Sequence, residues 1–462
     1  MKPKRVCAAG RLASHETPAR QLDAGRAGAA KRRADGDHLA SGEDGAILDD
    51  GAFPGRLCSA PIGGGRRLPQ GAATVGVRAR LAGLAAAPQG GPARAHEEGA
   101  AMRLTVSLRF SPGASLRVGT LFDLGRDVAF EYDRAFLATG INIAPFRLPP
   151  QQGVVVYDRS GNMDTFGVFE DSLPDGWGRR LMDSAYRRRH GRLPTVLERL
   201  ACVGTNGRGA LAYEPEESMD AETGLADLAA LAQSAMDFDV GKAEDVLPEV
   251  RRAGGSSGGA RPKAFVGFNP QTGEVCSERD VLPPGFEHWI VKFNTRRDGP
   301  DAGLREYRYY EKAVAAGVRM MSSRLIETRA GSFFATKRFD RTDDGGRLHV
   351  ASAAGLLHAD FRTPGDEYAL LFKLADALTH DYAAKEELFR RATLNVLEHN
   401  RDDHLKNFAF LMDTEGQWSL APFYDFTYSE GPNGWQTLSV AGEGANPTQR
   451  DLDRLAHEVG LR

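Results

Sequence analysis

The stretch that decides the fold reads Arg401-Asp-Asp-His-Leu-Lys-Asn407, and a second acid, Asp425, follows it in the sequence Phe-Tyr-Asp-Phe. Between the two, residues 408–420 read as an apolar strand, an Asp-Thr-Glu-Gly turn and a short return strand. A hairpin brings the chain back to its starting end. We therefore expect Asp425 to lie beside Asn407.

The residue types in this stretch suit phosphoryl transfer. That reaction needs a base near the acceptor hydroxyl and oxygen ligands for magnesium. Asp402 can orient or deprotonate the hydroxyl, while the Asn407 amide oxygen and the Asp425 carboxylate can share a magnesium ion. The order of acid, amide, hairpin and second acid resembles the active site of protein kinases.

A glycine-rich segment and a lysine-bearing strand lie upstream. Gly254-Gly-Ser-Ser-Gly-Gly259 precedes two predicted strands, the second of which carries Lys292. Glycines let backbone N–H groups approach phosphate oxygens, and a strand lysine adds a positive charge. A Gly-Ser run is also typical of a flexible linker. Phosphate binding and a linker both remain open for this segment.

The other elements predict a mixed α+β chain. Alternating residues between 104 and 132 favour a small antiparallel sheet, whereas residues 367–380 have the spacing of an amphipathic helix. A further helix is expected at about 304–316. There Glu306 or Glu311 can pair with the strand lysine, as the helix glutamate of a kinase nucleotide lobe does.

The composition excludes several classes of protein. The chain has 462 residues, 41% hydrophobic and 26% charged, as expected of two or more globular domains. No apolar run approaches the ~20 residues of a membrane helix, and no apolar core follows the N-terminal Lys and Arg residues as in a signal peptide. The four cysteines are far apart, which favours a reducing compartment over a disulfide framework or a zinc site. We expect a cytoplasmic protein.

Residues 1–101 differ from the rest of the chain. They are rich in Ala, Gly, Arg and Pro, contain one aromatic residue, Phe53, and carry 15 basic and 10 acidic residues. A segment with so little to bury is expected to be a disordered extension. We favour a natural start at Met102 over a functional basic tail, because the basic residues are scattered rather than clustered.

Five motifs follow one another after Met102. They are Leu-Pro-Asp-Gly-Trp-Gly-Arg-Arg (173–180), Gly-Gly-Ala-Arg-Pro-Lys (258–263), Lys-Arg-Phe-Asp-Arg (337–341), Asn-Arg-Asp-Asp-His-Leu-Lys-Asn-Phe (400–408) and Ala-Pro-Phe-Tyr-Asp (421–425). In this order they resemble the HipA-type serine/threonine-protein kinase toxins of bacterial type II toxin–antitoxin systems. The resemblance implies a two-lobed, protein-kinase-like fold with a β-rich N-terminal subdomain and a helical C-terminal lobe.

The resemblance also implies roles for single residues, with ATP and Mg²⁺ as cofactors. By position, Asp402 is similar to the catalytic acid of the family, Asn407 and Asp425 to its magnesium ligands, and Lys292 to its phosphate-contacting lysine. On the nucleotide side the matching positions are Gly258, Gly259, Ala260, Glu306, His404 and Lys406.

Regulation and partners are likewise implied by the family. A serine of the Gly-rich loop is autophosphorylated there, which ejects the loop and inactivates the enzyme. Ser256 is the better match, and the adjacent Ser257 competes with it. Known substrates of the family include aminoacyl-tRNA synthetases. The usual partner is a HipB-like helix-turn-helix antitoxin that binds operator DNA with the toxin, so that the kinase meets DNA only indirectly.

The sequence predicts four parts. They are a disordered extension (1–101), a β-rich N-terminal subdomain with a helical connector (102–250), the nucleotide-binding part of a kinase core (251–345) and a helical catalytic lobe (346–462). The last is expected to be truncated, because the chain stops at Arg462 soon after a predicted helix start near Thr448, whereas HipA proteins carry further helices.

Two other functions compete with the kinase. A metal-dependent hydrolase would use His399, Asp402, Asp403 and His404 as ligands for an activated water. A catalytically degenerate HipA-like protein would only bind an antitoxin on DNA. The excess of acidic residues after Met102 argues against DNA binding by the chain alone.

Overall fold

The computed structural model describes residues 102–157, 163–217, 227–244, 246–247, 250, 261–363 and 365–461. These residues lie in one compact unit, Gly71–Arg462. The predicted extension (1–101) lies outside the described residues. So do Ser256, Ser257, Gly258, Gly259 and Ala260 of the Gly-rich segment.

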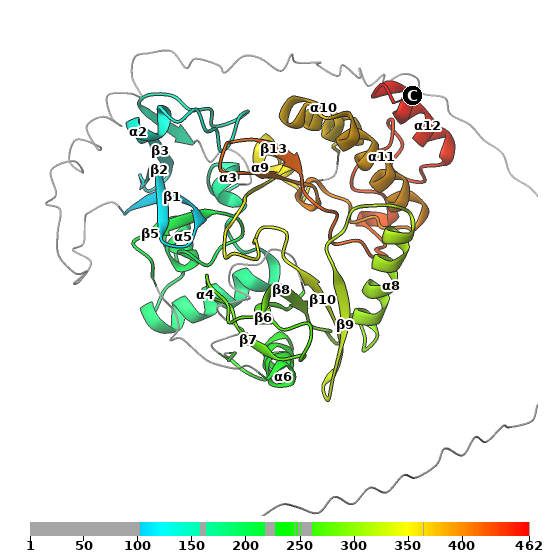
Figure 1. Cartoon of the computed structure of the whole chain (residues 1–462), viewed down its shortest axis with the longest axis horizontal. Helices are drawn as coiled ribbons and strands as arrows, with labels where there is room; N and C mark the ends of the chain where they lie inside the picture. Colours follow the sequence, from blue (N-terminus) through cyan, green and yellow to red (C-terminus); the bar gives the residue numbers. More distant parts are fainter. Residues whose placement is uncertain are drawn as a thin grey trace, which may run out of the picture. The chain divides into compact units, whose positions relative to one another are not determined.

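An antiparallel sheet opens the described chain (Figure 1). It has the order β4-β3-β2-β1-β5 and consists of β1 (Arg103–Ser111), β2 (Ala114–Asp123), β3 (Val128–Tyr132), β4 (Val154–Tyr157) and β5 (Leu211–Glu214). Leu104, Val106 and Leu108 of β1 share one face of the strand and enter the core, while the intervening Ser107 is buried as well. Residues of the helices α2 (Arg134–Leu137), α3 (Gly167–Glu170) and α5 (Val196–Val203) belong to the same hydrophobic core as the sheet. The predicted β-rich N-terminal subdomain is therefore present.

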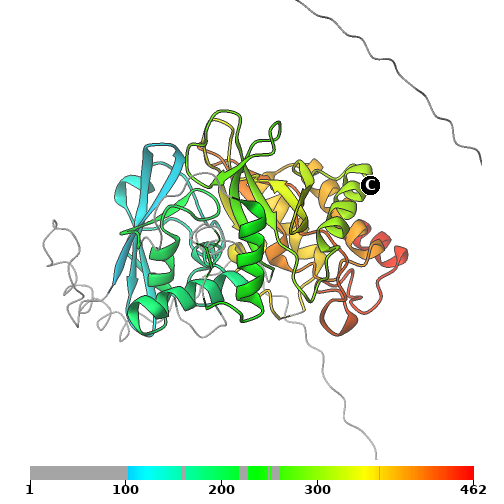
Figure 2. The same ribbon diagram turned by 90° about the horizontal axis from the view of Figure 1, so that it is seen from below.

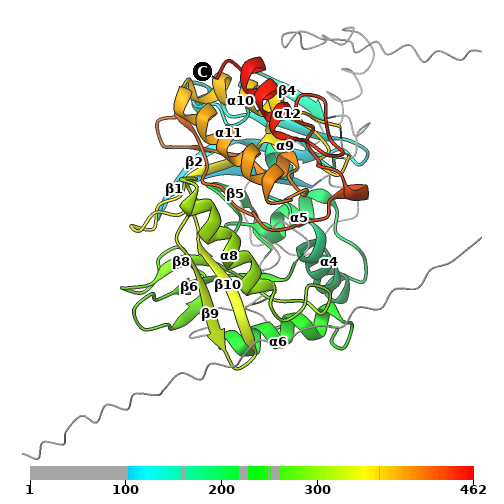
Figure 3. The same ribbon diagram turned by 90° about the vertical axis from the view of Figure 1, so that its right-hand side faces the viewer.

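A second sheet follows in the order β7-β6-β8-β10-β9. Its strands are β6 (Lys263–Phe268), β7 (Val275–Ser277), β8 (Glu287–Lys292), β9 (Ser323–Thr328) and β10 (Gly331–Lys337), and α8 (Ala302–Ala315) packs on β9 and β10. The three-residue β7 was not predicted, because a strand so short has no readable alternation. Two helices from the preceding segment, α4 (Gly176–His190) and α6 (Leu228–Asp239), lie in the same part of the molecule as this sheet (Figure 3). They contribute Trp177, Leu181 and Leu231 to its core.

The C-terminal part is mainly helical. It contains α9 (Ala353–Leu357), α10 (Tyr368–Thr379), α11 (Tyr382–Leu397) and α12 (Gln449–Glu458), which share one core. The predicted hairpin is present as β12 (Ala409–Met412) and β13 (Trp418–Leu420), and β11 (His349–Ser352) pairs with β12 as an unpredicted third strand. In Figure 2 the green middle of the chain lies between the cyan first sheet and the orange and red C-terminal helices.

Within the described ranges, none of the helices has the length and apolar character needed to cross a membrane. Cys202 and Cys276 both carry free thiols.

Candidate active site

The loop that carries the acids is held on two rigid elements. Helix α11 ends at Leu397, and the chain turns at His399, whose φ of 55° lies in the left-handed region. Asn400 then bonds back to the helix, because its backbone N–H and its side-chain amide donate to the backbone and side-chain oxygens of Asn395, each at 2.9 Å. After a single 3-10 turn at Leu405–Asn407 the chain enters β12. The loop is thus fixed by α11 at its start and by β12 at its end.

Asp402 points its carboxylate toward solvent, with 63% of the side chain exposed. The Asn407 side-chain amide donates to the Asp402 backbone carbonyl at 2.8 Å, so the five-residue spacing closes the loop on itself. Desolvation and the negative charge of Asp425 raise the pKa of Asp402, while His404, 3.8 Å from its carboxylate, lowers it. Asp402 is therefore an accessible carboxylate whose basicity is increased by its surroundings.

Asp403 faces the opposite way, into the protein, and is only 1% exposed. Its carboxylate accepts hydrogen bonds from the Tyr368 hydroxyl at 2.5 Å, from the Gln436 amide at 3.2 Å, and from the backbone N–H groups of Thr437 and Leu438 at 2.9 and 3.3 Å. Burial raises the pKa of Asp403 to about 6, against the opposing effect of these hydrogen bonds. Asp403 is a structural anchor of the loop.

The ammonium group of Lys292, at the end of β8, contacts two carboxylates. It donates to Glu306 of α8 at 2.5 Å and forms an ion pair with Asp425. Glu306 is 3% exposed and also binds Arg261 at 3.1 Å, whereas Glu311 is exposed. Burial alone would lower the pKa of Lys292, but Asp425 and Glu306 raise it, so the lysine stays charged.

Asp425 is held in a strongly positive setting. Its backbone φ of 57° is in the left-handed region, which is uncommon for a residue other than glycine. Lys263 lies directly opposite Lys292 in the pairing of β6 with β8 and is buried. Burial by itself would raise the pKa of Asp425, but Lys292 and Lys263 hold it well below the usual range of an aspartate. Asp425 is therefore ionised.

The two ends of the hairpin are joined by a hydrogen bond beside the acids. The Tyr424 hydroxyl donates to the backbone carbonyl of Lys406 at 2.8 Å, so the residues that precede Asp425 and Asn407 are tied together. The Lys406 ammonium is buried and binds Asp175 at 2.7 Å. Its Nζ also lies 4.9 Å from the ring centroid of Phe361, against which His404 packs.

Two family models match the chain. The HipA N-terminal domain matches residues 114–214, and the HipA-like C-terminal domain matches residues 255–462, so that more than half of the chain is covered. The chain belongs to the HipA family. The C-terminal HipA match includes Lys292, Asp402, Asn407 and Asp425.

A solved HipA structure shares the fold of this chain. The HipA of Shewanella oneidensis MR-1, solved with HipB and its operator DNA, is 19% identical, has a TM-score of 0.57, and is matched over 78% of this chain and 85% of its own. The predicted two-lobed, kinase-like HipA fold is confirmed. The proinflammatory kinase CtkA of Helicobacter pylori shares 17% identity over 30% of this chain and 50% of its own, with a TM-score of only 0.25. A search of curated proteins finds no match.

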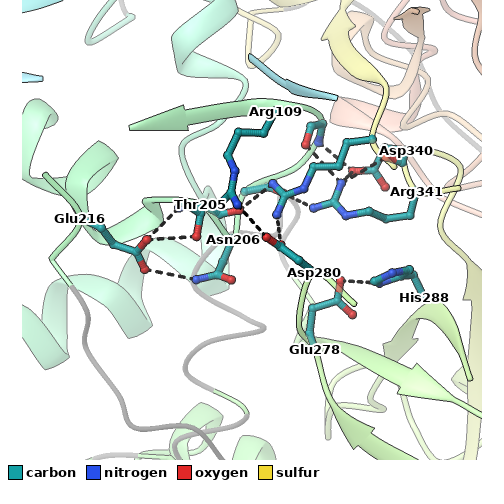
Figure 4. A network of polar contacts seen from close by, with 12 residues as sticks. Arg109, Thr205, Asn206, Glu216, Glu278, Asp280, His288, Asp340 and Arg341 are labelled. Carbon is teal, nitrogen blue, oxygen red and sulfur yellow. Dashed lines mark hydrogen bonds and ion pairs between the residues drawn. The ribbon is translucent and has the colours of Figure 1, made fainter. Parts of the chain in front are cut away.

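The Lys-Arg-Phe-Asp-Arg motif of this HipA protein builds a buried ionic network (Figure 4). Arg338 is 1% exposed and binds Asp340 at 2.7 Å, while Arg341 donates to Asp340 and to the backbone carbonyl of Gly207 at 2.8 and 3.0 Å. Burial alone would raise the pKa of Asp340, but the two arginines hold it far below its usual range. The motif therefore joins the segment before β5 to the end of β10.

Among the residues that it describes, the structure does not bring together the metal ligands that the alternative of a metal-dependent hydrolase requires. In the part of the chain that the structure describes, no group of three or more His, Cys, Asp or Glu side chains is placed to hold a metal ion. Of the proposed ligands, Asp403 is occupied by buried hydrogen bonds and His404 packs on Phe361. The described residues therefore do not form the ligand set that this hydrolase would need.

The sequence pattern did not single out several residues of the site. Arg261 and Lys263 lie within the Gly-Gly-Ala-Arg-Pro-Lys motif, and they contribute positive charge around Glu306 and Asp425. Asp175 likewise lies within a motif, 231 positions before the lysine that it binds. Each of them is a charged residue inside a motif, which could have marked it as a candidate. The sequence spacing, however, does not indicate which distant residue it contacts.

Proposed function

We propose that this HipA-family chain is an ATP-dependent serine/threonine-protein kinase that transfers the γ-phosphoryl group to a protein hydroxyl and to itself. The observation that carries the proposal is the pairing of the Lys292 ammonium with both Glu306 and Asp425. A strand lysine paired with a helix glutamate, next to a metal-binding aspartate, is the arrangement that protein kinases need for transfer.

Asp402 is the proposed catalytic base. Its carboxylate is accessible, and its raised pKa makes it a better proton acceptor for a substrate hydroxyl than an ordinary aspartate. Asp403, its neighbour, is buried and engaged with four donors, so it is a poor candidate. The exposed carboxylate would orient the hydroxyl and take up its proton.

Asn407 and Asp425 are the proposed magnesium ligands, and their chemistry fits the ion. Mg²⁺ is commonly held by one or two carboxylates together with substrate phosphates and water. Asp425 is ionised, and the Asn407 amide nitrogen donates to Asp402, which leaves the amide oxygen to face a ligand. Bound Mg²⁺ would neutralise charge on the phosphates, and Lys292 would hold the same phosphates.

The remaining nucleotide contacts stay proposals of the same kind. Glu306 keeps Lys292 oriented. His404 and Lys406 are proposed to approach the nucleotide from the loop around the 3-10 turn, although the Lys406 ammonium is bound to Asp175 in this structure. Gly258, Gly259 and Ala260 are proposed to cover the phosphates, although they lie outside the described residues.

Autophosphorylation of Ser256 is proposed as the means of inactivation, with Ser257 as the competing site; both lie outside the described residues. A phosphate adds nearly two negative charges, which would repel the phosphates of ATP. Mass spectrometry after incubation with ATP is expected to find the modification at Ser256. Modification at Ser257 alone, or at neither serine, would contradict this assignment.

A HipB-like helix-turn-helix antitoxin is the proposed partner, and DNA is met only through it. Support comes from the HipA of Shewanella oneidensis MR-1, which was solved with HipB and operator DNA. The proposed target is a protein hydroxyl, with an aminoacyl-tRNA synthetase as the first candidate by family resemblance.

Magnesium dependence tests the kinase proposal. ATP affinity of the wild type is expected to rise when Mg²⁺ is added, and this response is expected to vanish in Asp425→Ala, because the best-placed carboxylate ligand is lost. Asp453→Ala removes an exposed carboxylate on α12 and serves as the control. An equal Mg²⁺ response in wild type and Asp425→Ala would exclude the assigned metal site.

A further inference from the structure

The Leu-Pro-Asp-Gly-Trp-Gly motif is joined to both lobes of the kinase core. Just before it, the Asp171 carboxylate accepts hydrogen bonds from the backbone N–H and the hydroxyl of Ser352 at 2.5 and 2.6 Å, next to the small sheet of the C-terminal lobe. Within it, Trp177 is 1% exposed and lies in the core of the second sheet. The motif thus runs from one lobe to the other as a short strut.

Asp175, in the middle of this strut, reaches the catalytic loop. Its carboxylate binds the Lys406 ammonium at 2.7 Å, and the two side chains are only 11% and 10% exposed. A buried lysine needs such a partner, because an ammonium group removed from water without compensation costs several kcal/mol in this kind of setting. The strut therefore fixes the side chain of Lys406.

Lys406 is fixed at its backbone as well. Its carbonyl accepts the hydrogen bond from Tyr424, the residue before Asp425, at 2.8 Å. The next residue is Asn407, whose side chain closes the loop on Asp402. Any shift of Lys406 is therefore passed directly to Asn407.

We infer that Asp175 is a positioning residue that acts through Lys406 to hold Asn407, and with it the magnesium site, in place for phosphoryl transfer. This inference rests on the proposed kinase function. It gives the N-terminal HipA domain a part in catalysis, because the residue that aligns the catalytic loop comes from that half of the chain. Residues behind a metal ligand commonly change metal affinity by about 10–100-fold when they are replaced.

The test compares Asp175→Asn with Asp183→Asn in the full-length protein. Asp183 lies on α4, the helix that begins directly after Asp175, and pairs with Arg199 at 2.8 Å, so its replacement removes a similar ion pair away from the catalytic loop. Two quantities are measured against Mg²⁺ concentration: the single-turnover rate of autophosphorylation and the affinity for ATP. Thermal unfolding of each variant is recorded beside them.

Asp175→Asn is expected to raise the Mg²⁺ concentration at half-maximal rate by about tenfold or more. It is expected to leave ATP affinity without Mg²⁺ unchanged, and Asp183→Asn is expected to keep the wild-type Mg²⁺ dependence. A purely structural role for Asp175 would lower the unfolding temperature without moving the Mg²⁺ dependence, and that result would overturn the inference. If the wild-type protein binds Mg²⁺-ATP but transfers no phosphoryl group, only the kinase proposal is refuted. The dependence of ATP affinity on Mg²⁺ concentration still tests the role of Asp175.

A second variant guards against misfolding. Replacing both partners, as Asp175→Leu with Lys406→Met, removes both charges of this ion pair, and such exchanges are often tolerated. This double variant is expected to fold and to show the same raised Mg²⁺ requirement. A wild-type Mg²⁺ requirement in the folded double variant would also overturn the inference.

Discussion

Asp402 and Asp403 are chemically identical neighbours that belong to two different regions of the molecule. The Asp402 side chain is 63% exposed on the side of the loop that meets Asp425 and His404. Asp403 is 1% exposed and serves as the acceptor for Tyr368 and the segment after Gln436. Although the two residues are adjacent in the chain, the Asp402 carboxylate is accessible to solvent, whereas the Asp403 carboxylate holds the loop in its conformation.

The comparison shows that burial, and not residue type, assigns the roles. Both environments raise the pKa of the acid, yet only Asp402 is accessible to a substrate hydroxyl. The donors around Asp403 are satisfied only while its side chain stays inside. We therefore expect a substitution of Asp402 to change the rate of phosphoryl transfer, and a substitution of Asp403 to change the stability of the protein.

The largest effect is expected from Asp402→Asn. The amide is nearly isosteric but cannot accept the hydroxyl proton, so single-turnover transfer should fall by about 10²–10⁴-fold while ATP affinity stays close to that of the wild type. Asp403→Asn is the matched control and should retain transfer in the folded protein. An active Asp402→Asn beside an inactive Asp403→Asn would reverse the assignment of the two acids.

The pH dependence of stability is the next largest effect. The folded state holds the proton of Asp403 up to about pH 6, whereas an unfolded aspartate loses it near ~3.9, so this group stabilises the fold most at low pH. The free energy of unfolding of the wild type, relative to Asp403→Asn, should therefore fall by up to about 3 kcal/mol between pH 4 and 6. Urea unfolding of both proteins across that range measures it. A difference that grows with pH would mean that the four donors keep the carboxylate ionised.

The smallest effect is expected from Tyr368→Phe. It removes the hydroxyl that donates to Asp403 and accepts from the Asn395 amide at 2.9 Å, and the loss of each of these two hydrogen bonds costs about 1 kcal/mol of unfolding free energy. Transfer by Asp402 should be unaffected at a temperature where the variant is folded. Chemical unfolding and single-turnover assays on the same preparation give both values. A large loss of transfer without a loss of stability would place Tyr368 in the chemistry instead.

Local patterns in the sequence predicted most of the elements around the site. The apolar residues after Asn407 and the turn before Trp418 predicted the hairpin, and the structure has it as β12 and β13. The helix with Glu306 and the strand with Lys292 were also predicted, within a few residues of their ends. Such features depend on neighbours in the chain, and these are visible in a sequence.

Partnerships across the chain could not be predicted in the same way. Both Glu306 and Glu311 were open as partners of Lys292, and packing of α8 on the second sheet decided for Glu306. The third strand beside the hairpin, β11, was missed because its pairing partner lies about sixty residues away. The sequence contains no spacing rule for such pairs, since they depend on how whole elements dock.

By itself the sequence determined the family resemblance, the α+β class and the loop that carries the proposed catalytic acid, because spacing within one loop and alternation within one strand are local properties. Only the tertiary structure decided which acid is exposed, which glutamate pairs with Lys292 and which residue holds Lys406. Those outcomes depend on burial and on charges that meet across distant segments. An ion pair such as Asp175 with Lys406 exists because two packed elements exclude water from both groups at once.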